Sequence, residues 1–241
     1  MIANEFTIRF AAIGQWMAPP VISSESTGQY TLVHEAADPN WINELCEQAQ
    51  ACEWLTPTEL RHLSTATEVI WVEQKIFLDT HRDVHDRLLM AQNGVSALRM
   101  LCKEGDVYAL FFDESQRVAR PEVLQEVDLR EATSLLHLFV ECWCDEEFAY
   151  TEGLSIFACP NIEVEAQYVN DPIAQATAFS AAAQLVCDGL VLTDQSQFRS
   201  SESFPYFTCQ LSREADMQDE EIINPWGLIR LSRTQKASPQ K

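Results

Sequence analysis

Two cysteines separated by a single residue are the side chains best suited to nucleophilic chemistry. Cys142 and Cys144 flank Trp143, and Cys159 follows. Zinc sites usually pair cysteines with two residues between them, so this spacing is not typical of a zinc ligand set. Residues i and i+2 of a strand share a face, which lets both thiols lie in a core. We favour this structural role; the alternative is a reactive thiol with His137 as its base.

Two histidine patterns resemble metal-binding motifs. His34-Glu35 is followed by Asp38, where a zinc-protease signature needs its second histidine, and Pro39 indicates a strand–helix junction. His81 and His85 are four residues apart, a spacing that chelates a transition metal when a third ligand joins. Both histidines fall at the margin of an apolar helix face, among aspartates, so a solvated helix face explains them. We therefore predict no metal site.

The glycines argue against phosphate-binding loops. Dinucleotide fingerprints and P-loops need at least two glycines within about six residues. The seven glycines of this chain are far more widely spaced, at positions 14, 28, 94, 105, 153, 189 and 227. The chain also has no Gly-x-Ser-x-Gly elbow. We predict no cofactor, and we recognise no catalytic motif.

The charge of the chain favours a basic partner. Sixteen basic and 37 acidic residues give a formal net charge of −21. Phosphate backbones and anionic membranes repel such a surface, so we expect neither direct nucleic-acid binding nor membrane binding. A basic protein is attracted to it, and electrostatic steering raises association rates by roughly tenfold to a thousandfold. The alternative is that acidity only keeps the protein in solution.

Two acidic clusters are the candidate partner-binding residues. Neither has the alternating oxygen ligands and glycine of a calcium loop, so solvated loops and a docking surface are the two interpretations. The docking interpretation assigns partner contacts to Asp145, Glu146, Glu147, Glu214, Asp216, Asp219, Glu220 and Glu221.

The eight cysteines indicate a reducing compartment. They are dispersed through apolar segments, which favours free thiols acting as small core residues. No signal peptide is recognisable, because Glu5 and Arg9 interrupt the first apolar run. No stretch reaches the ~18 apolar residues of a membrane span. We expect a cytoplasmic protein, and we leave its oligomeric state open.

Hydrophobic periodicity predicts the elements that must position these residues. Strands are expected over 6–10, 30–35, 69–72, 107–112, 135–143, 162–165, 207–211 and 227–231. Asp38-Pro39 and Asp171-Pro172 predict capped helix starts, and a long helix is expected from Val84 to near Gly105. These elements predict an α+β fold with a single mixed or antiparallel sheet and two or three packed helices. We expect one domain over residues 1–231 and a flexible polar tail over 232–241.

The stretch from Thr151 to Phe157 is followed by Pro160, Ile162, Glu163 and Val164, and then by the helix after Asp171. This pattern resembles a bacterial family known as domain of unknown function 4261, and the resemblance covers about residues 105–195. It implies an α+β fold and a bacterial source, but no activity. Ala158 stands where the family has glycine, and Asn161 where it has glutamate, so any chemical role of that glutamate is absent here.

Together these observations favour a non-catalytic binding protein. The leading hypothesis is an acidic cytosolic immunity or antitoxin-like inhibitor that neutralises a basic bacterial toxin by direct binding, because complementary charge speeds the encounter of such pairs. One alternative is an adaptor or subunit of a larger assembly, which an exposed apolar patch around Trp16 or Trp54 would favour. The other is an enzyme with an unrecognised site, which a pocket with Cys or His beside a carboxylate would favour.

Overall fold

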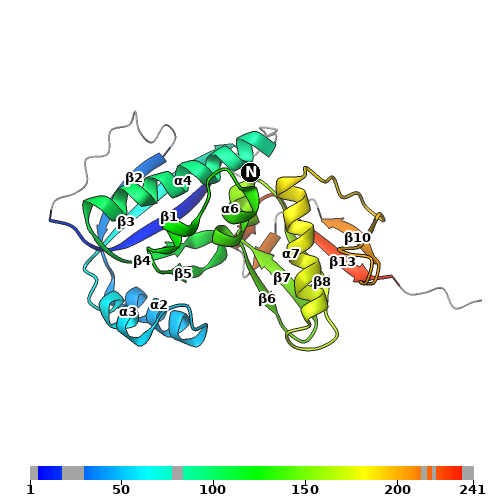
Figure 1. Ribbon diagram of the computed structural model, residues 1–241, viewed down its shortest axis with the longest axis horizontal. Helices are drawn as coiled ribbons and strands as arrows, with labels where there is room; N and C mark the ends of the chain where they lie inside the picture. Colours follow the sequence, from blue (N-terminus) through cyan, green and yellow to red (C-terminus); the bar gives the residue numbers. More distant parts are fainter. Residues whose placement is uncertain (1–4, 18–29, 78–83, 213–215, 219–220, 235–241) are drawn as a thin grey trace, which may run out of the picture. The chain divides into compact units, whose positions relative to one another are not determined.

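The computed structural model describes residues 5–17, 30–77, 84–212, 216–218 and 221–234 (Figure 1). The chain divides into two compact units, residues 1–139 and 140–241, which we call unit 1 and unit 2. The prediction of one domain over 1–231 stays a prediction, because two compact units can unfold together or separately.

Unit 1 is built on a five-stranded antiparallel sheet with strand order β2-β3-β1-β4-β5. Its strands are β1 (Glu5–Gln15), β2 (Tyr30–Ala36), β3 (Glu68–Phe77), β4 (Asp106–Phe112) and β5 (Arg117–Ala119). Its helices are α2 (Pro39–Ala51), α3 (Pro57–Leu63), α4 (Val84–Glu104), α5 (Val123–Glu126) and α6 (Ala132–Phe139), with a 3-10 turn η1 (Asp113–Ser115).

Both faces of this sheet are covered, which explains the buried side chains on either side of β1. On one face α4 comes so close to β1 that a β-carbon at Gly94 would lie 2.7 Å from the Phe10 ring. Phe139 of α6 packs on that face too, with its ring 5.2 Å from Phe10 and 5.3 Å from Phe112. On the opposite face α2 and α3 cover a second core that contains Ala11, Ile13, Ile42, Leu45, Leu63, Val69, Trp71 and Phe111. Figure 1 shows α4 and the α2–α3 pair on opposite sides of the sheet.

Unit 2 has a six-stranded mixed sheet with strand order β6-β7-β8-β13-β10-β9. Only β8 and β13 pair in parallel, which requires the chain to cross over between them. The strands are β6 (Glu141–Cys144), β7 (Phe148–Glu152), β8 (Asn161–Glu165), β9 (Gln197–Phe198), β10 (Phe207–Ser212) and β13 (Leu228–Arg233). Helix α7 (Pro172–Cys187) and the 3-10 turn η2 (Leu154–Phe157) complete the unit, with a separate pair β11 (Asp216–Gln218) and β12 (Glu221–Asn224).

Helix α7 packs on β6, β7 and β8, on one face of the unit 2 sheet (Figure 1). It begins as predicted: Asp171 accepts hydrogen bonds from the backbone of Ile173 and Ala174, and Pro172 occupies the first turn. The helix has no charged residue over its 16 positions. Its sheet-facing side is made largely of small residues, including Ala174, Ala178, Ala181 and Ala182, which let the helix approach the strands closely.

The predicted single sheet with two or three helices is wrong. The described part of the chain has two main sheets, of five and six strands, and six α-helices. Periodicity identifies strands but does not say which strands share an edge, so it cannot separate one sheet from two. The prediction of a strand over 135–143 is also wrong, because 132–139 form α6 and only 141–144 form β6. A continuous apolar run suits a buried helix as well as a buried strand.

Two predicted strands are shorter than the observed ones, since the sequence predicts 6–10 where β1 spans Glu5–Gln15 and 69–72 where β3 spans Glu68–Phe77. The bounds of α4, β2, β4, β8 and β10 follow the predictions closely. Strand β13 extends to Arg233, two residues into the segment predicted as a tail, while 235–241 lie outside the described residues. None of the helices in the described part of the chain could span a lipid bilayer.

Candidate functional site

The first acidic cluster forms the turn between β6 and β7. Asp145, Glu146 and Glu147 are all exposed. The Asp145 carboxylate accepts hydrogen bonds from the backbone N–H groups of Glu147, at 2.7 Å, and Phe148, at 2.8 Å. These N–H groups lower the pKa of Asp145, the Phe148 bond most, because they stabilise the charged form. Asp145 therefore holds the hairpin turn, and Glu146 and Glu147 are the members of this cluster that a partner can contact freely.

The second acidic cluster lies mostly outside the described residues. Glu214, Asp219 and Glu220 are not described. The backbone places Asp216 on β11 and Glu221 on β12, which pair in antiparallel fashion with Gln218 opposite Glu221. The segment between β10 and β13 thus contains a short hairpin, where the sequence indicated a surface loop.

The Cys142 thiol is a poor nucleophile. Burial raises the pKa of Cys142 to about 12, with smaller contributions from Cys144 and Glu141, so its thiol is protonated at neutral pH. Cys142 and Cys144 are half-buried on β6, while Cys159 and Cys209 are buried. His137, the suggested base, lies exposed on α6 in unit 1.

The histidine motifs bring no ligand set together. His34 lies on β2 with its Nε2 3.1 Å from Oε1 of Glu68, and Oε2 of Glu68 accepts the Trp16 backbone N–H. His85 is exposed on α4, and His81 is outside the described residues. No group of three or more His, Cys, Asp or Glu side chains in the described part of the chain could hold a metal ion.

Neither of the two tryptophans that could have marked an exposed apolar patch is fully exposed. Trp16 is 7% exposed and packs on Gly105, where a β-carbon would lie 2.2 Å from the indole nitrogen. Trp54 is half-buried against the core beneath α2 and α3. The patch that would have favoured an adaptor role is therefore absent at these two positions.

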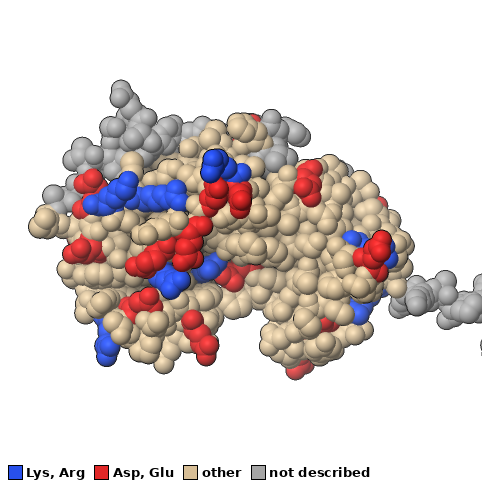
Figure 2. Space-filling model, in the orientation of Figure 1, with Lys and Arg blue, Asp and Glu red and all other residues tan. Residues whose placement is uncertain are grey.

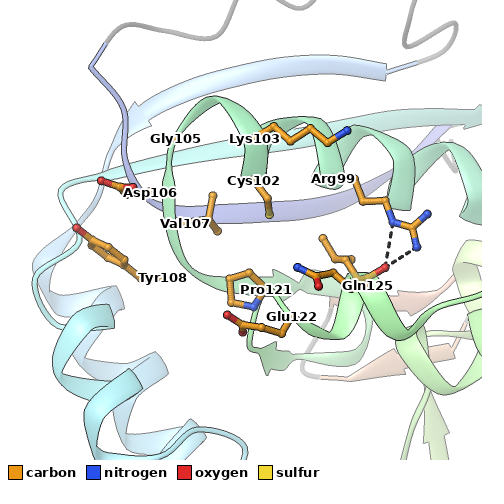
Figure 3. A pocket seen from close by; sticks show the side chains of 11 residues that line it. Arg99, Cys102, Lys103, Gly105, Asp106, Val107, Tyr108, Pro121, Glu122 and Gln125 are labelled. Carbon is orange, nitrogen blue, oxygen red and sulfur yellow. Dashed lines mark hydrogen bonds between the residues drawn. The ribbon is translucent and has the colours of Figure 1, made fainter.

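A pocket of about 630 Å³ lies between the end of α4, the start of β4 and α5 (Figure 3). Arg99 lines it and donates through Nε to the Leu124 carbonyl at 3.0 Å and through Nη2 to the Val127 carbonyl at 2.8 Å. Burial, and to a lesser degree Glu122, raise the pKa of Cys102 in the same pocket to about 11. Because the guanidinium holds the end of α5 and the thiol stays protonated, this pocket presents no activated nucleophile.

A second pocket, of about 410 Å³, combines aromatic rings with carboxylates. We call it the aromatic pocket; the rings of Trp41, Trp71 and Phe111 line it. The Trp41 centroid lies 5.5 Å from that of Trp71 and 5.5 Å from that of Phe111. Its other lining residues are Arg9, Glu35, Ala36, Asp38, Val69, Asp113 and Gln116.

The local fold explains how this pocket forms. Trp71 and Phe111 occupy positions of β3 and β4 that both pair with Ala11 of β1, so their side chains share the sheet face that α2 covers. The N-terminus of α2 carries Asp38 and Trp41 to that face. Periodicity indicated these residues only as core or cap positions, because cross-strand register is not readable from one strand at a time.

The resemblance to domain of unknown function 4261 rests on its motif alone and stays a prediction. At one of the two departures from that motif, Ala158 adopts a left-handed backbone conformation with φ 50°, which glycine favours. At the other, Asn161 is buried and donates to the Tyr150 hydroxyl at 3.0 Å. Comparisons with family models, with curated proteins and with solved structures found no match for this chain.

Proposed function

We propose that this protein is a non-catalytic acidic binding protein that neutralises a basic bacterial toxin by direct contact, as a cytoplasmic immunity or antitoxin-like inhibitor. The observation that carries the proposal is the surplus of carboxylates. If all 16 basic side chains were paired one to one with acidic ones, 21 of the 37 acidic side chains would still lack a cationic partner. A basic protein surface can neutralise this excess.

The surplus is shared by both units, so each unit by itself attracts a basic partner. Residues 1–139 have 21 acidic and 10 basic side chains, and residues 140–241 have 16 and 6. Exposed carboxylates of the described chain include Glu44, Glu47, Glu122, Glu126, Glu146, Glu147, Asp188, Asp194 and Glu202. Figure 2 shows acidic groups spread over the face of unit 1 seen there, whereas the surface of α7 in unit 2 has none.

Affinity purification of the tagged protein from its native cells tests this function. We expect one basic protein to co-elute in a stoichiometric complex near physiological salt. We expect the complex to dissociate as salt rises, because the Debye length falls from roughly 8 Å at 0.15 M to 3 Å at 1 M. The purified partner should lose its toxic activity when this protein is added in equimolar amount. Recovery of an assembly of several neutral or acidic subunits would contradict the proposal and favour an adaptor.

A further inference from the structure

We propose that the aromatic pocket of unit 1 receives an arginine side chain of the basic partner. The partner itself rests on the proposed function, but the chemistry of the pocket can be tested without it. Guanidinium groups bind the faces of tryptophan rings by cation–π attraction and stacking, and they bind carboxylates through two parallel hydrogen bonds. The aromatic pocket offers both kinds of group within one cavity.

The charge of the lining matches a cation. Three carboxylates line the pocket, those of Glu35, Asp38 and Asp113, against one guanidinium, that of Arg9. The charge of Arg9 is already matched, because its Nε lies 3.1 Å from Oε1 of Glu73. The described lining therefore has a net negative charge that an incoming cation would neutralise. Glu35 and Asp38 are exposed, so their carboxylates are accessible from solvent.

The chain itself contains an example of the proposed contact. Cζ of Arg9 lies 4.0 Å from the centroid of the Trp71 ring, within the range of a cation–π pair. This arginine covers Trp71, which is only 8% exposed. Trp41 is half-buried and lines the same cavity, so its ring is the surface that remains for a second guanidinium. The planar shape of the guanidinium suits this position better than a lysine ammonium does.

The volume of the aromatic pocket also suits an arginine side chain. A cavity of about 410 Å³ falls in the range of roughly 300–1,000 Å³ typical of sites for small ligands, which is ample for one side chain. Its walls are fixed by the sheet and by the first turn of α2, where Asp38 accepts the Asn40 backbone N–H at 2.9 Å. A pocket on regular elements binds with little loss of conformational entropy.

The test uses the whole protein and small probes. N-acetyl-arginine amide is titrated while the indole N–H resonances of Trp41 and Trp71 are followed by NMR, with assignments from Trp→Phe variants. We expect saturable shifts of the Trp41 resonance at millimolar concentrations. N-acetyl-citrulline amide, which has the same shape without the charge, should produce no saturable shift. Equal responses to the two probes, or an equal response to N-acetyl-lysine amide, would overturn the assignment to arginine.

Three sets of variants sharpen the test. The near-isosteric triple variant Glu35→Gln/Asp38→Asn/Asp113→Asn keeps the helix cap, since Asn also caps helices, and should weaken binding of the arginine probe at least tenfold. A control removes three exposed charges elsewhere in unit 1, at Glu44, Glu47 and Glu104, and should keep wild-type affinity. Arg9→Gln should strengthen binding severalfold, because it removes a like charge and uncovers Trp71. Unchanged affinity in the triple variant, or weaker binding in Arg9→Gln, contradicts the proposal.

Different experimental results would contradict the arginine-binding role of the pocket and the proposed function of the protein. If the arginine probe binds but no basic partner is recovered, the function is wrong and the pocket stands. If the partner binds the triple variant with wild-type affinity, the function stands and the pocket is not part of the interface. Trp41→Phe provides a second check, because it keeps an aromatic ring in the core and leaves the Trp71 resonance as the readout. This variant should bind the arginine probe severalfold more weakly, and wild-type affinity would contradict the proposal.

Discussion

Nη2 of Arg233 donates to the carboxylate of Asp171 at 3.0 Å, across 62 positions of sequence, and the Asp171 side chain is only 1% exposed. The same carboxylate accepts backbone N–H groups from Gln167, Ile173 and Ala174. Asp171 thus caps α7 and also joins the end of β13 to the start of that helix. The sequence predicted the cap, but the arginine comes from the last strand of the described chain.

Replacing Asp171 should destabilise the protein more than replacing an ordinary cap. We expect Asp171→Ala to lower the free energy of unfolding by about 3 kcal/mol, because a partly buried guanidinium and several N–H groups lose their acceptor. Asp38→Ala, at the exposed cap of α2, should cost about 1 kcal/mol. Urea denaturation measures both. Equal losses in the two variants would show that the Arg233 contact adds nothing to the cap.

Ala158→Gly should stabilise the protein. Ala158 has φ 50°, and the left-handed conformation costs a non-glycine residue roughly 1–2 kcal/mol. Removing its mostly buried methyl group costs about 0.8 kcal/mol of hydrophobic stabilisation. We therefore expect the free energy of unfolding to rise by about 0.5 kcal/mol. Ala176→Gly, at an exposed position inside α7, should instead lose about 1 kcal/mol. A higher melting temperature for the first variant and a lower one for the second checks the prediction; a loss in both contradicts it.

The thiols should be reduced in the native protein, and two of them should react slowly. Thiol titration of the denatured protein, purified anaerobically without reductant, should find all eight cysteines free. In the folded protein Cys102 and Cys142, with pKa values of about 11 and 12, should be alkylated far more slowly at about pH 8 than a free cysteine. Mass spectrometry of the labelled peptides gives the rates. Fewer than eight free thiols would contradict the first statement, and fast labelling of Cys102 the second.

The same thiols should make the protein less stable in alkali. Their pKa values rise on folding from the ordinary 9.0, so their contribution to stability is complete below pH 9.0 and is lost as pH rises toward 11 and 12. The double variant Cys102→Ala/Cys142→Ala should therefore lose less stability than the wild type between pH 9 and 11. Parallel urea denaturation series over this range provide the comparison. If the free energy of unfolding falls equally with pH in both proteins, groups other than these two thiols cause the loss of stability in alkali.

Neutralising the second acidic cluster should affect association and leave folding nearly unchanged. The amide variant at Glu214, Asp216, Asp219, Glu220 and Glu221 should leave the melting temperature nearly unchanged, because each carboxylate contributes on the order of a few tenths of a kcal/mol to stability. Association with the basic partner should slow, and its dependence on salt should weaken. Stopped-flow mixing over a salt series measures both. Wild-type rates at every salt concentration would mean that the cluster serves only solubility.

Because the chain divides into two units, the cooperativity of its unfolding tests the prediction of one domain. The sequence predicts one domain over 1–231, and one domain should unfold in a single transition whose calorimetric and van't Hoff enthalpies agree. Separate probes exist, because Trp71 lies in unit 1 and Trp226 in unit 2. Two fluorescence transitions with different midpoints in single-tryptophan variants would contradict the prediction of one domain.

Local features of the fold were predictable because their causes are local. An aspartate followed by proline predicted the starts of α2 and α7, since the cap and the first turn are neighbours in sequence. Alternation predicted β1 and β8, and the apolar period of α4 predicted a helix from Val84 to near Gly105. The apolar segment over 135–143 has neither a cap nor a clear alternation, and the prediction of a single strand there is wrong.

The charge of the protein, the capped starts of α2 and α7 and the positions of β1, β2, β3, β4, β8, β10 and β13 follow from the sequence alone. The sequence does not show that the strands form two main sheets, that Arg233 contacts Asp171, or that Trp41, Trp71 and Phe111 line one cavity. Periodicity and capping act over a few residues. Sheet order, cross-strand register and the meeting of side chains depend on which distant segments pack together, because burial is shared among all of them.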